Sequence, residues 1–305
     1  MNYDLVIVGA GPAGLTAAIY ARRAGKSVLL IEKGAFGGQM TYSPKIENYP
    51  GFEALSGIEL ADKMVSHALE LGAEVEVAVV TGIENLPGGG KVVHTDDGGR
   101  FECKAVVLAT GAKHRMLGVP GEAALVGNGV SFCAVCDGAF YEGKEVAVIG
   151  GGNSALQEAL LLCKTSKKVT LVQNLPYFTG EQTLLAKLQK EPNVAFLTGK
   201  VVASFEAEDS ELRGVRLRDL DGNESDLAVD GVFVAIGLEP DNRPFEELVK
   251  LDCGYILADE DCVTSCPGIF TAGDCRKKQI RQITTATGDG AVAALAACKY
   301  IDDRF

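Results

Sequence analysis

The chain has 305 residues, of which 41 are acidic and 29 are basic, so its formal net charge is −12. This charge would repel the phosphate backbone of a nucleic acid over most of the surface, and no nucleic-acid partner is expected. Hydrophobic residues make up 47% of the chain. No apolar run reaches the roughly 18 residues that a membrane-spanning helix needs, and the first residues do not resemble an export signal. We therefore expect a cytoplasmic protein without a membrane partner.

A βαβ unit is predicted at the start of the chain. The apolar run Leu5–Val8 indicates a strand, Gly14–Ala24 favours a helix, and Ser27–Ile31 indicates a second strand that closes on Glu32. The turn between the first strand and the helix is rich in glycine, as in dinucleotide-binding proteins.

Each glycine of this turn has a distinct expected task. Gly9 permits the tight turn, Gly11 lets a pyrophosphate approach the backbone N–H groups at the start of the helix, and Gly14 allows close packing of helix on strand. Glu32 would accept hydrogen bonds from a ribose. The alternative is a tight turn without a ligand.

The same order of elements returns in the middle of the chain. A strand is predicted over Glu145–Ile149, then Gly150 and Gly152, a helix over Ser154–Cys163 and a strand over Val169–Val172. The fold class predicted is α/β, with two Rossmann-like, doubly wound nucleotide-binding domains and small antiparallel β additions. These additions are expected over Val75–Val80, Lys91–Thr95 and Glu102–Leu108 after the first unit, and over Val194–Leu197, Val201–Glu206, Gly214–Arg218 and Gly231–Ile236 after the second.

Breaks in regular structure are expected near Lys113 and near Asn242, where glycine and proline interrupt the pattern. They predict a discontinuous domain formed by residues 1–113 and 243–305, and a central domain over 114–242.

Several further motifs follow the first turn in a recognisable order. They are Gly37–Gln39, Glu47–Phe52, Ala109–Gly111, Thr271–Asp274, and Arg281–Gln282 with Thr285–Ala286. With them the chain resembles the low-molecular-weight thioredoxin reductases over nearly its whole length. The resemblance implies FAD as cofactor, a homodimer, and an FAD site formed by Gly9, Gly11, Pro12, Ala13, Gly14, Glu32, Lys33, Gly38, Gln39, Asn48, Thr110, Gly111, Gly273, Asp274, Arg281, Gln282 and Ile283. Taken alone, Asp274 is also a good helix-capping residue.

Cys133 and Cys136 are the expected centre of the chemistry. Two cysteines three residues apart can close a short disulfide ring, and the thiolate formed on reduction can attack an external disulfide. Asp137 is the nearest candidate for transferring protons to and from the dithiol. The alternatives are half of a zinc site or two buried thiols.

Four later cysteines have no assigned role. Cys253 and Cys275, or Cys262 and Cys266, would complete such a zinc site, but the intervals between the four fit no compact iron–sulfur pattern. No metal is expected.

The second glycine loop departs from the family pattern. The family carries a His-Arg-Arg run after the following strand to hold the 2′-phosphate of NADPH, whereas Gln173, Asn174 and Leu175 stand here. NADPH is therefore expected to bind weakly. Some members of the family that lack this run are reduced by ferredoxin, so both donors stay open. The basic residues Arg276–Lys278 and Arg281 are either a solvated loop or a docking patch for an acidic partner.

The function predicted is that of a flavoprotein disulfide reductase, which passes electrons through FAD to Cys133 and Cys136 and on to thioredoxin or a similar small dithiol protein. The rival functions are a ferredoxin:NADP-type reductase and a non-catalytic flavin-binding sensor.

Overall fold

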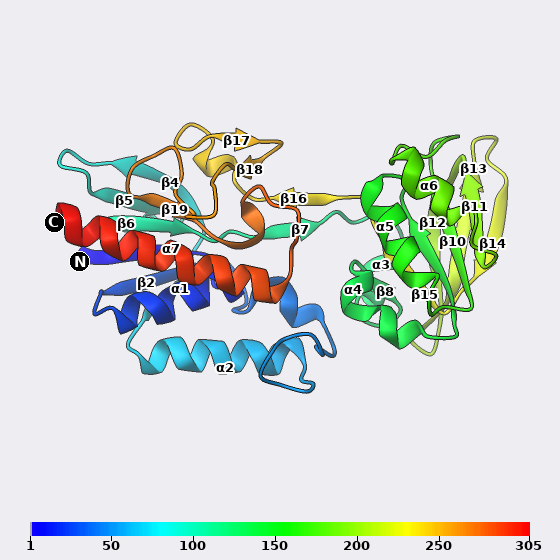
Figure 1. The fold of residues 1–305 in the computed structure, drawn as a ribbon, viewed down its shortest axis with the longest axis horizontal. Coiled ribbons are helices and arrows are strands. Elements are labelled where there is room, and N and C mark those ends of the chain that lie inside the picture. Colours follow the sequence, from blue (N-terminus) through cyan, green and yellow to red (C-terminus); the bar gives the residue numbers. More distant parts are fainter. Residues whose placement is uncertain (1) are drawn as a thin grey trace. The chain divides into compact units, whose positions relative to one another are not determined.

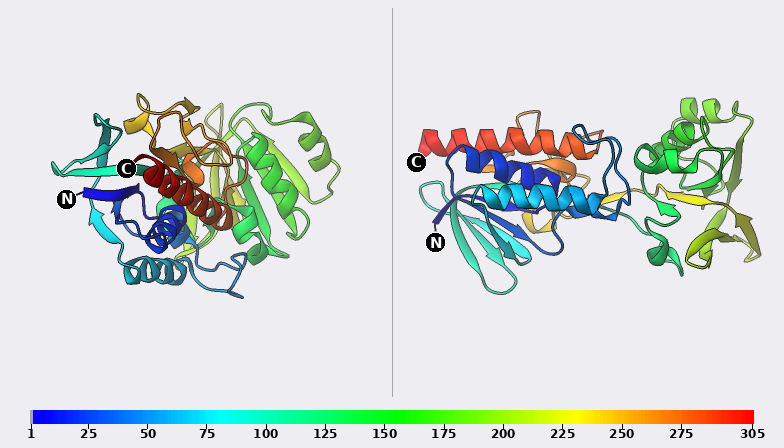
Figure 2. Two further views of the ribbon diagram at one scale, coloured as in Figure 1. Left: turned by 60° about the vertical axis from the view of Figure 1, so that its left-hand side comes forward. Right: turned by 90° about the horizontal axis from the view of Figure 1, so that it is seen from below.

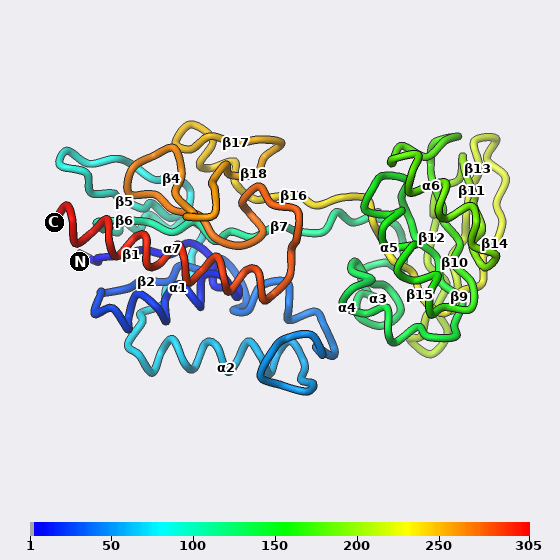
Figure 3. Tube along the Cα trace, viewed as in Figure 1, coloured from blue at the N-terminus to red at the C-terminus, as the bar shows by residue number. Residues whose placement is uncertain are grey.

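The computed structural model describes residues 2–305, which form two compact units. Unit 1 consists of the chain up to Lys113 together with Glu239–Phe305, and unit 2 is His114–Leu238. The chain leaves unit 1 along β7 (Ala112–His114) and returns along β16 (Leu238–Pro240), and these two strands pair with each other (Figure 3).

The second boundary lies slightly earlier than the sequence predicted, because Asn242 belongs to unit 1. Its amide donates hydrogen bonds to the carbonyl oxygens of Gly254 and Cys275, at 2.9 Å each. Its side-chain oxygen accepts a bond of 2.7 Å from the hydroxyl of Thr110.

Unit 1 is built on one large sheet in the order β3-β2-β1-β6-β5-β4, with β19 also paired to β6. The parallel pairs are β3 with β2, β2 with β1, β1 with β6, and β6 with β19. The pairs of β6 with β5 and of β5 with β4 are antiparallel. The strands are β1 (Asn2–Val8), β2 (Val28–Glu32), β3 (Glu74–Val77), β4 (Val80–Asn85), β5 (Lys91–Thr95), β6 (Arg100–Leu108) and β19 (Ile269–Thr271).

Both faces of this sheet are covered, as the alternation along β1 shows. Leu5 and Ile7 pack against the helices α1 (Pro12–Arg23), α2 (Gly57–Glu70) and α7 (Ile283–Arg304), whereas Val6 and Val8 join a second core on the opposite face. The three helices form one layer in Figures 1 and 2. The carboxyl end of β1, where the chain turns into α1, therefore lies between two packed layers.

The expectation that Val75–Val80 and Glu102–Leu108 belong to an antiparallel addition is only partly right. Val80 begins the antiparallel strand β4, and Arg100–Cys103 of β6 pair antiparallel with β5, but Val75–Val77 lie in the parallel strand β3, and the rest of β6 belongs to the parallel part of the sheet. β6 lies between β1 and β19 and is parallel to both, and β3 is a parallel edge strand. The residues from Ala105 to Leu108 are all fully buried. Burial on both faces explains this continuous apolar run, which is typical of a parallel strand inside a sheet.

Unit 2 repeats the layered plan with a five-stranded parallel sheet in the order β11-β10-β9-β15-β8. Here the structure corrects a second expectation from the sequence. Val194–Leu197 and Gly231–Ile236 fall in parallel strands and not in an antiparallel addition. The strands are β8 (Val130–Ser131), β9 (Glu145–Ile149), β10 (Lys168–Gln173), β11 (Val194–Thr198) and β15 (Gly231–Val234).

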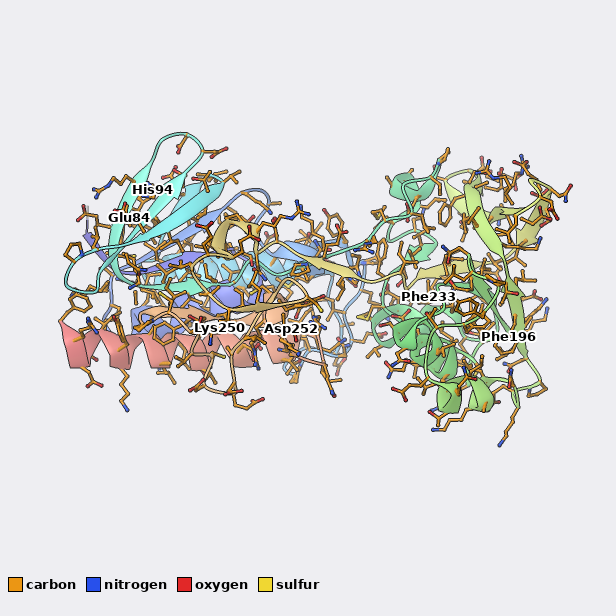
Figure 4. All side chains as sticks on the ribbon, turned by 90° about the horizontal axis from the view of Figure 1, so that it is seen from above. Glu84, His94, Phe196, Phe233, Lys250 and Asp252 are labelled. Carbon is orange, nitrogen blue, oxygen red and sulfur yellow. A yellow bond between two sulfur atoms is a disulfide. The ribbon has the colours of Figure 1, made fainter. Side chains whose placement is uncertain are left out.

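The two faces of this second sheet have different covers. α5 (Asn153–Leu162) and α6 (Gln182–Leu188) pack on one face, where Phe233 is fully buried (Figure 4). The other face meets an antiparallel sheet of β12 (Lys200–Glu208), β13 (Glu211–Asp219) and β14 (Glu224–Ala228). Each unit is thus Rossmann-like, and the predicted fold class is confirmed.

The remaining elements are short and connect the layers. They are α3 (Glu122–Leu125), α4 (Ala134–Asp137), β17 (Leu251–Asp252), β18 (Tyr255–Ile256), and the 3-10 turns η1 (Gly38–Tyr42), η2 (Gly138–Tyr141), η3 (Arg243–Phe245) and η4 (Gly273–Cys275). Among the helices in residues 2–305, none has the length and apolar character needed to cross a membrane.

Candidate functional site

The first glycine turn in unit 1 is tightly packed at two of its glycines and open at the third. Gly9 has φ of +104°, and a Cβ there would overlap the carbonyl oxygen of Ala109. A Cβ at Gly14 would overlap the carbonyl oxygen of Gly9. At Gly11 the nearest atom to such a Cβ is the Cα of Gly38, 4.0 Å away. The turn therefore leaves free space only where a ligand would approach the start of α1.

Glu32 lies at the end of β2 and faces this turn. Its Oε2 accepts a hydrogen bond of 2.7 Å from the backbone N–H of Ala10, and its Oε1 accepts one of 3.0 Å from Gly34. Lys33 forms an ion pair with Asp241. A cavity of about 90 Å³ opens beside these residues, lined also by Val8, Gly9, Thr110 and Phe245.

The other predicted cofactor-binding residues converge on the same region of unit 1. Gly37, next to Gly38 and Gln39, donates a bond of 2.8 Å to the carbonyl of Ala10. Asn48 donates one of 3.3 Å to the side chain of Gln282, which lies 234 residues later. The structure places Pro12 and Ala13 in the first turn of α1, Thr110 and Gly111 after β6, Gly273 and Asp274 in η4, and Arg281, Gln282 and Ile283 at the start of α7.

Asp274 carries a polar atom that lacks a partner. Its Oδ1 is buried and accepts no hydrogen bond from any part of the chain between residues 2 and 305. Burial raises the pKa of this carboxyl group, although Lys278 and Arg281 act in the opposite direction. A buried acceptor left unpaired is costly, so a ligand hydroxyl fits here better than solvent does. The open space at Gly11 and this acceptor together fit a flavin dinucleotide.

The basic segment after Asp274 is held by ion pairs within unit 1 at three of its residues. Arg276 is buried and paired with Asp289, and Lys278 binds the same carboxylate. Lys277 is exposed but paired with Asp252. The guanidinium of Arg281 lies 4.4 Å from the ring centre of Tyr255. Two carboxylates, Asp289 and Asp252, therefore oppose the charge of three of these four cations within unit 1.

Cys133 and Cys136 form a disulfide around α4 in unit 2, with their Cα atoms 5.3 Å apart. The backbone N–H of Cys136 donates to the sulfur of Cys133 at 3.2 Å. A hydrogen bond to sulfur favours the thiolate, so this contact stabilises charge on Cys133 once the disulfide opens.

Asp137 is tied to the disulfide by one intervening hydroxyl. Ser131 accepts a bond of 3.1 Å from the N–H of Cys133 and donates one of 2.6 Å to Oδ2 of Asp137. The second oxygen, Oδ1, is buried and has no partner among residues 2–305. Burial raises the pKa of this carboxyl group, and the bond from Ser131 lowers it in part. Asp137 is therefore suited to take up a proton.

Sequence reasoning missed a second carboxylate near this disulfide, that of Glu158 on α5. Its Oε2 is also buried without a partner in the described part of the chain. A signal was present: Glu158 is three residues from Ala155 and four from Leu162, which are both buried. Helical spacing thus places this glutamate on the apolar face of α5.

The second glycine loop, in unit 2, repeats the construction of the first. The N–H of Gly9 donates to Ile31 at 2.8 Å, and that of Gly150 donates to Val172 at 2.9 Å. A Cβ at Gly150 would overlap the carbonyl oxygen of Ala235, just as one at Gly9 would overlap Ala109. Both loops thus have the close strand contact of a dinucleotide-binding turn.

The end of β10 beside this loop carries no cation. The buried side chain of Gln173 packs against Gly151 and donates a bond of 3.3 Å to the carbonyl of Tyr177. The next two residues, Asn174 and Leu175, are exposed and uncharged. A phosphate placed here would find no charge-assisted hydrogen bond from these positions.

The other cysteines take no part in a cluster. Cys253 is exposed, whereas Cys262, Cys266 and Cys275 are buried free thiols. Across residues 2–305, no three histidine, cysteine or acidic side chains lie close enough to hold a metal ion. Cys133 and Cys136 are bonded to each other and are not grouped with the later cysteines as the zinc alternatives would require.

Comparison with known proteins agrees with this arrangement. The pyridine nucleotide-disulphide oxidoreductase model matches residues 3–290. A thioredoxin reductase of Bacillus subtilis is 43% identical over 99% of this chain and 95% of its own length. A 34.2 kDa protein from the rubredoxin operon of Clostridium pasteurianum is 41% identical over 98% of this chain and 97% of its own length.

A solved structure gives the same result. The thioredoxin reductase of Streptococcus pyogenes superimposes with a TM-score of 0.94 at 42% identity, and 99% of each chain is covered. The resemblance found in the sequence is thereby confirmed. The chain belongs to the pyridine nucleotide-disulphide oxidoreductases and, within them, to the low-molecular-weight thioredoxin reductases, which are flavoprotein disulfide reductases.

Proposed function

We propose that this protein uses FAD, bound in unit 1, to reduce the Cys133–Cys136 disulfide, and that the resulting dithiol reduces thioredoxin or a similar small dithiol protein. The observation that carries the proposal is the disulfide itself, linked through Ser131 to the buried carboxyl group of Asp137. The names of the relatives support thioredoxin as the partner. Neither the ferredoxin:NADP-type reductase nor the non-catalytic sensor accounts for that arrangement.

The FAD site is proposed from an open stretch of backbone, a carboxylate that faces it and an acceptor that lacks a protein partner. The open backbone at Gly11 would receive the pyrophosphate at the start of α1. Glu32 would accept from the ribose, and Oδ1 of Asp274 from a hydroxyl of the ribityl chain. On the basis of the family resemblance, Arg281, Gln282 and Ile283 are proposed to lie beside the ring system. When bound, the flavin supplies the electron pair that opens the disulfide.

The disulfide chemistry follows from the residues around α4. Two electrons and two protons convert the Cys133–Cys136 bond into two thiols. One of these gives up its proton and, as a thiolate, attacks a sulfur of the partner disulfide. A mixed disulfide forms, and the partner's other sulfur leaves as a thiolate, which takes up that proton. The second enzyme thiol then gives its proton to Asp137 and attacks the mixed disulfide. The Cys133–Cys136 bond closes again, and the partner's second thiol takes the proton.

The electron donor is proposed from the second glycine loop. Because Gln173, Asn174 and Leu175 supply no cation, NADPH should be a poor donor, and reduced ferredoxin is the alternative. An anaerobic titration of the flavin absorbance with each donor tests this directly. Flavin reduction by ferredoxin but not by micromolar NADPH supports the proposal, whereas full reduction by micromolar NADPH refutes this part of it.

The cellular setting is proposed on separate grounds. Seven free thiols beside one disulfide fit a reducing cytoplasm. The family resemblance supports a homodimer. Alkylation of oxidised and reduced protein, followed by peptide mapping, tests the redox pair: Cys133 and Cys136 should be protected only in the oxidised sample, and a stoichiometric zinc content would refute the proposal.

A further inference from the structure

Two carboxylates, each with one fully buried oxygen, lie at the two ends of α4, the short helix that carries the redox pair. Asp137 is the last residue of α4, and Glu158 lies on α5, which packs against α4 (Figure 1). A hydrogen bond from the backbone of Ala134, the neighbour of Cys133, reaches the carboxylate of Glu158. One oxygen of each acid, Oδ1 of Asp137 and Oε2 of Glu158, is buried without a partner in residues 2–305.

The surroundings of these acids are short of positive charge. Asp137 is the ionisable side chain that acts on Glu158, and it destabilises the charged form. The hydroxyl of Ser131, from β8, binds Asp137. Tyr141, from η2, stays neutral because burial raises its pKa to about 12, with Asp137 and then Asp230 adding to the effect. None of these neighbours would compensate two negative charges.

Only one of the two acids is therefore expected to be ionised near neutral pH. Burial raises the pKa of Glu158 to about 8, and Asp137 adds to the increase. Burial also raises the pKa of Asp137. Two interacting carboxyl groups in such a site lose their protons in two separate steps, and between these steps the pair keeps one proton.

We propose that Glu158 is a positioning residue of the disulfide centre: Glu158 and Asp137 hold one proton between them, and Asp137 exchanges that proton with the thiols of Cys133 and Cys136. This inference rests on the proposed function. It adds that the proton acceptor for the second thiol is a pair of acids and not Asp137 alone. Asp137 takes the proton from that thiol, and the distribution of protons between Asp137 and Glu158 changes with it. The proton taken up is later released to the partner's second thiol.

The test is the pH dependence of a single turnover. The purified protein, with its flavin bound, is reduced in stoichiometric amount and mixed with hydroxyethyl disulfide, an alkyl disulfide whose leaving thiol must be protonated. In the wild type the shared proton persists up to about pH 8. Glu158→Gln removes the second acid, so Asp137 should lose its proton at a lower pH. The alkaline limb of the rate profile should then shift to lower pH by roughly one unit. At a fixed alkaline pH, the variant should therefore be about tenfold slower than the wild type.

Two control variants separate this effect from a structural one. Glu142→Gln changes an exposed glutamate near the same site and should leave the profile unchanged. Glu158→Asp keeps a carboxyl group and should restore a profile close to that of the wild type. A profile for Glu158→Gln that coincides with the wild type, or a shift shared by Glu142→Gln, would overturn the proposal.

Infrared spectroscopy gives a readout that does not depend on turnover. A protonated carboxyl band that titrates near pH 8 should be present in the wild type and absent in Glu158→Gln. If that variant does not fold, the same band should be lost from Asp137→Asn or shifted in its titration, because the two acids interact. A wild-type protein without such a band contradicts the proposal. Failure of the proposed function is a different result, since wild-type protein would then not reduce hydroxyethyl disulfide at any pH.

Discussion

Arg276 and Asp289 form a buried ion pair with two hydrogen bonds, in which Nε and Nη2 of the arginine donate to the carboxylate at 2.8 and 2.9 Å. Lys278 donates to the same carboxylate at 2.8 Å, and the N–H of Gly273 donates to it at 3.0 Å. The pair thus joins α7 to the turn η4, which presents Asp274. Arg276 and Lys278 therefore stabilise the candidate cofactor site from within unit 1.

Replacing Asp289 should therefore destabilise unit 1 strongly. In Asp289→Asn two buried cations lose their counter-charge, and the expected loss is about 3–5 kcal/mol of unfolding free energy. Urea denaturation of the purified variant measures it. Asp252→Asn, which removes the exposed partner of Lys277, is the matched control and should have little effect. Equal unfolding midpoints for the two variants would show that the buried pair contributes nothing.

Retention of FAD should depend on the unpaired oxygen of Asp274. Asp274→Ala and Glu32→Ala each remove an acceptor for ligand hydroxyls, and each should weaken FAD binding by about 1–3 kcal/mol. Equilibrium binding of FAD to the apoprotein measures the loss. Glu84→Gln on β4, the edge strand of the sheet, is the control, because Glu84 is exposed and lies beside His94 (Figure 4). Unchanged flavin affinity in both alanine variants would place the cofactor elsewhere.

The stability of unit 2 should fall in mild acid because of His114. Its ring stacks on Phe132 at 4.8 Å, and burial lowers its pKa to about 4. The unfolded chain binds the proton first, near the usual pKa of about 6.5, so stability is lost as the pH falls below that value.

His114→Phe keeps the stacked ring and removes this titration. Between about pH 7 and about pH 5 the variant should lose roughly 1–2 kcal/mol less than the wild type does. Denaturant unfolding at both pH values measures the difference. His67→Gln, at an exposed position on α2, should behave as the wild type does. If the acid sensitivity of His114→Phe equals that of the wild type, the burial of His114 is unimportant.

The local motifs of this chain could be predicted from sequence, and the long-range pairings could not. The turn at Gly9, Gly11 and Gly14 and the pair Cys133–Cys136 depend on residues a few positions apart, so their spacing is visible in the chain. The parallel pairing of β6 with β1 depends on contacts between segments that are distant in sequence. Its apolar run from Ala105 to Leu108 does not reveal the direction of its neighbours.

The role of charged residues was harder still to predict. Arg276–Lys278 is a basic run in the sequence, but its neutralisation by Asp289 and Asp252 depends on how α7 and the β17–β18 hairpin pack. Glu158 was overlooked because a charged residue on a helix is usually solvated. The only signal in the sequence was its helical spacing from Ala155 and Leu162, which corresponds to the buried face of α5.

The use of NADPH should improve if cations are restored beside the second glycine loop. Asn174→Arg with Leu175→Arg places two guanidinium groups at exposed positions, where they do not disturb the core. Each charge-assisted bond to a phosphate contributes about 1.5–3 kcal/mol, so NADPH affinity should rise by at least about tenfold.

NADH is the matched control for that variant, because it lacks the 2′-phosphate and should gain little. Flavin reduction by each nucleotide, followed anaerobically, provides the measurement. An equal gain for NADH and NADPH, or no gain for either, would mean that the missing cations do not limit the use of NADPH.

The most direct test of the central claim is the number of electrons that the purified protein accepts. In an anaerobic dithionite titration, wild-type protein should take up two electrons for the flavin and two more for the Cys133–Cys136 disulfide. The double variant Cys133→Ser with Cys136→Ser should keep its flavin and accept two electrons only. The account is contradicted if wild type and variant accept the same number of electrons per flavin.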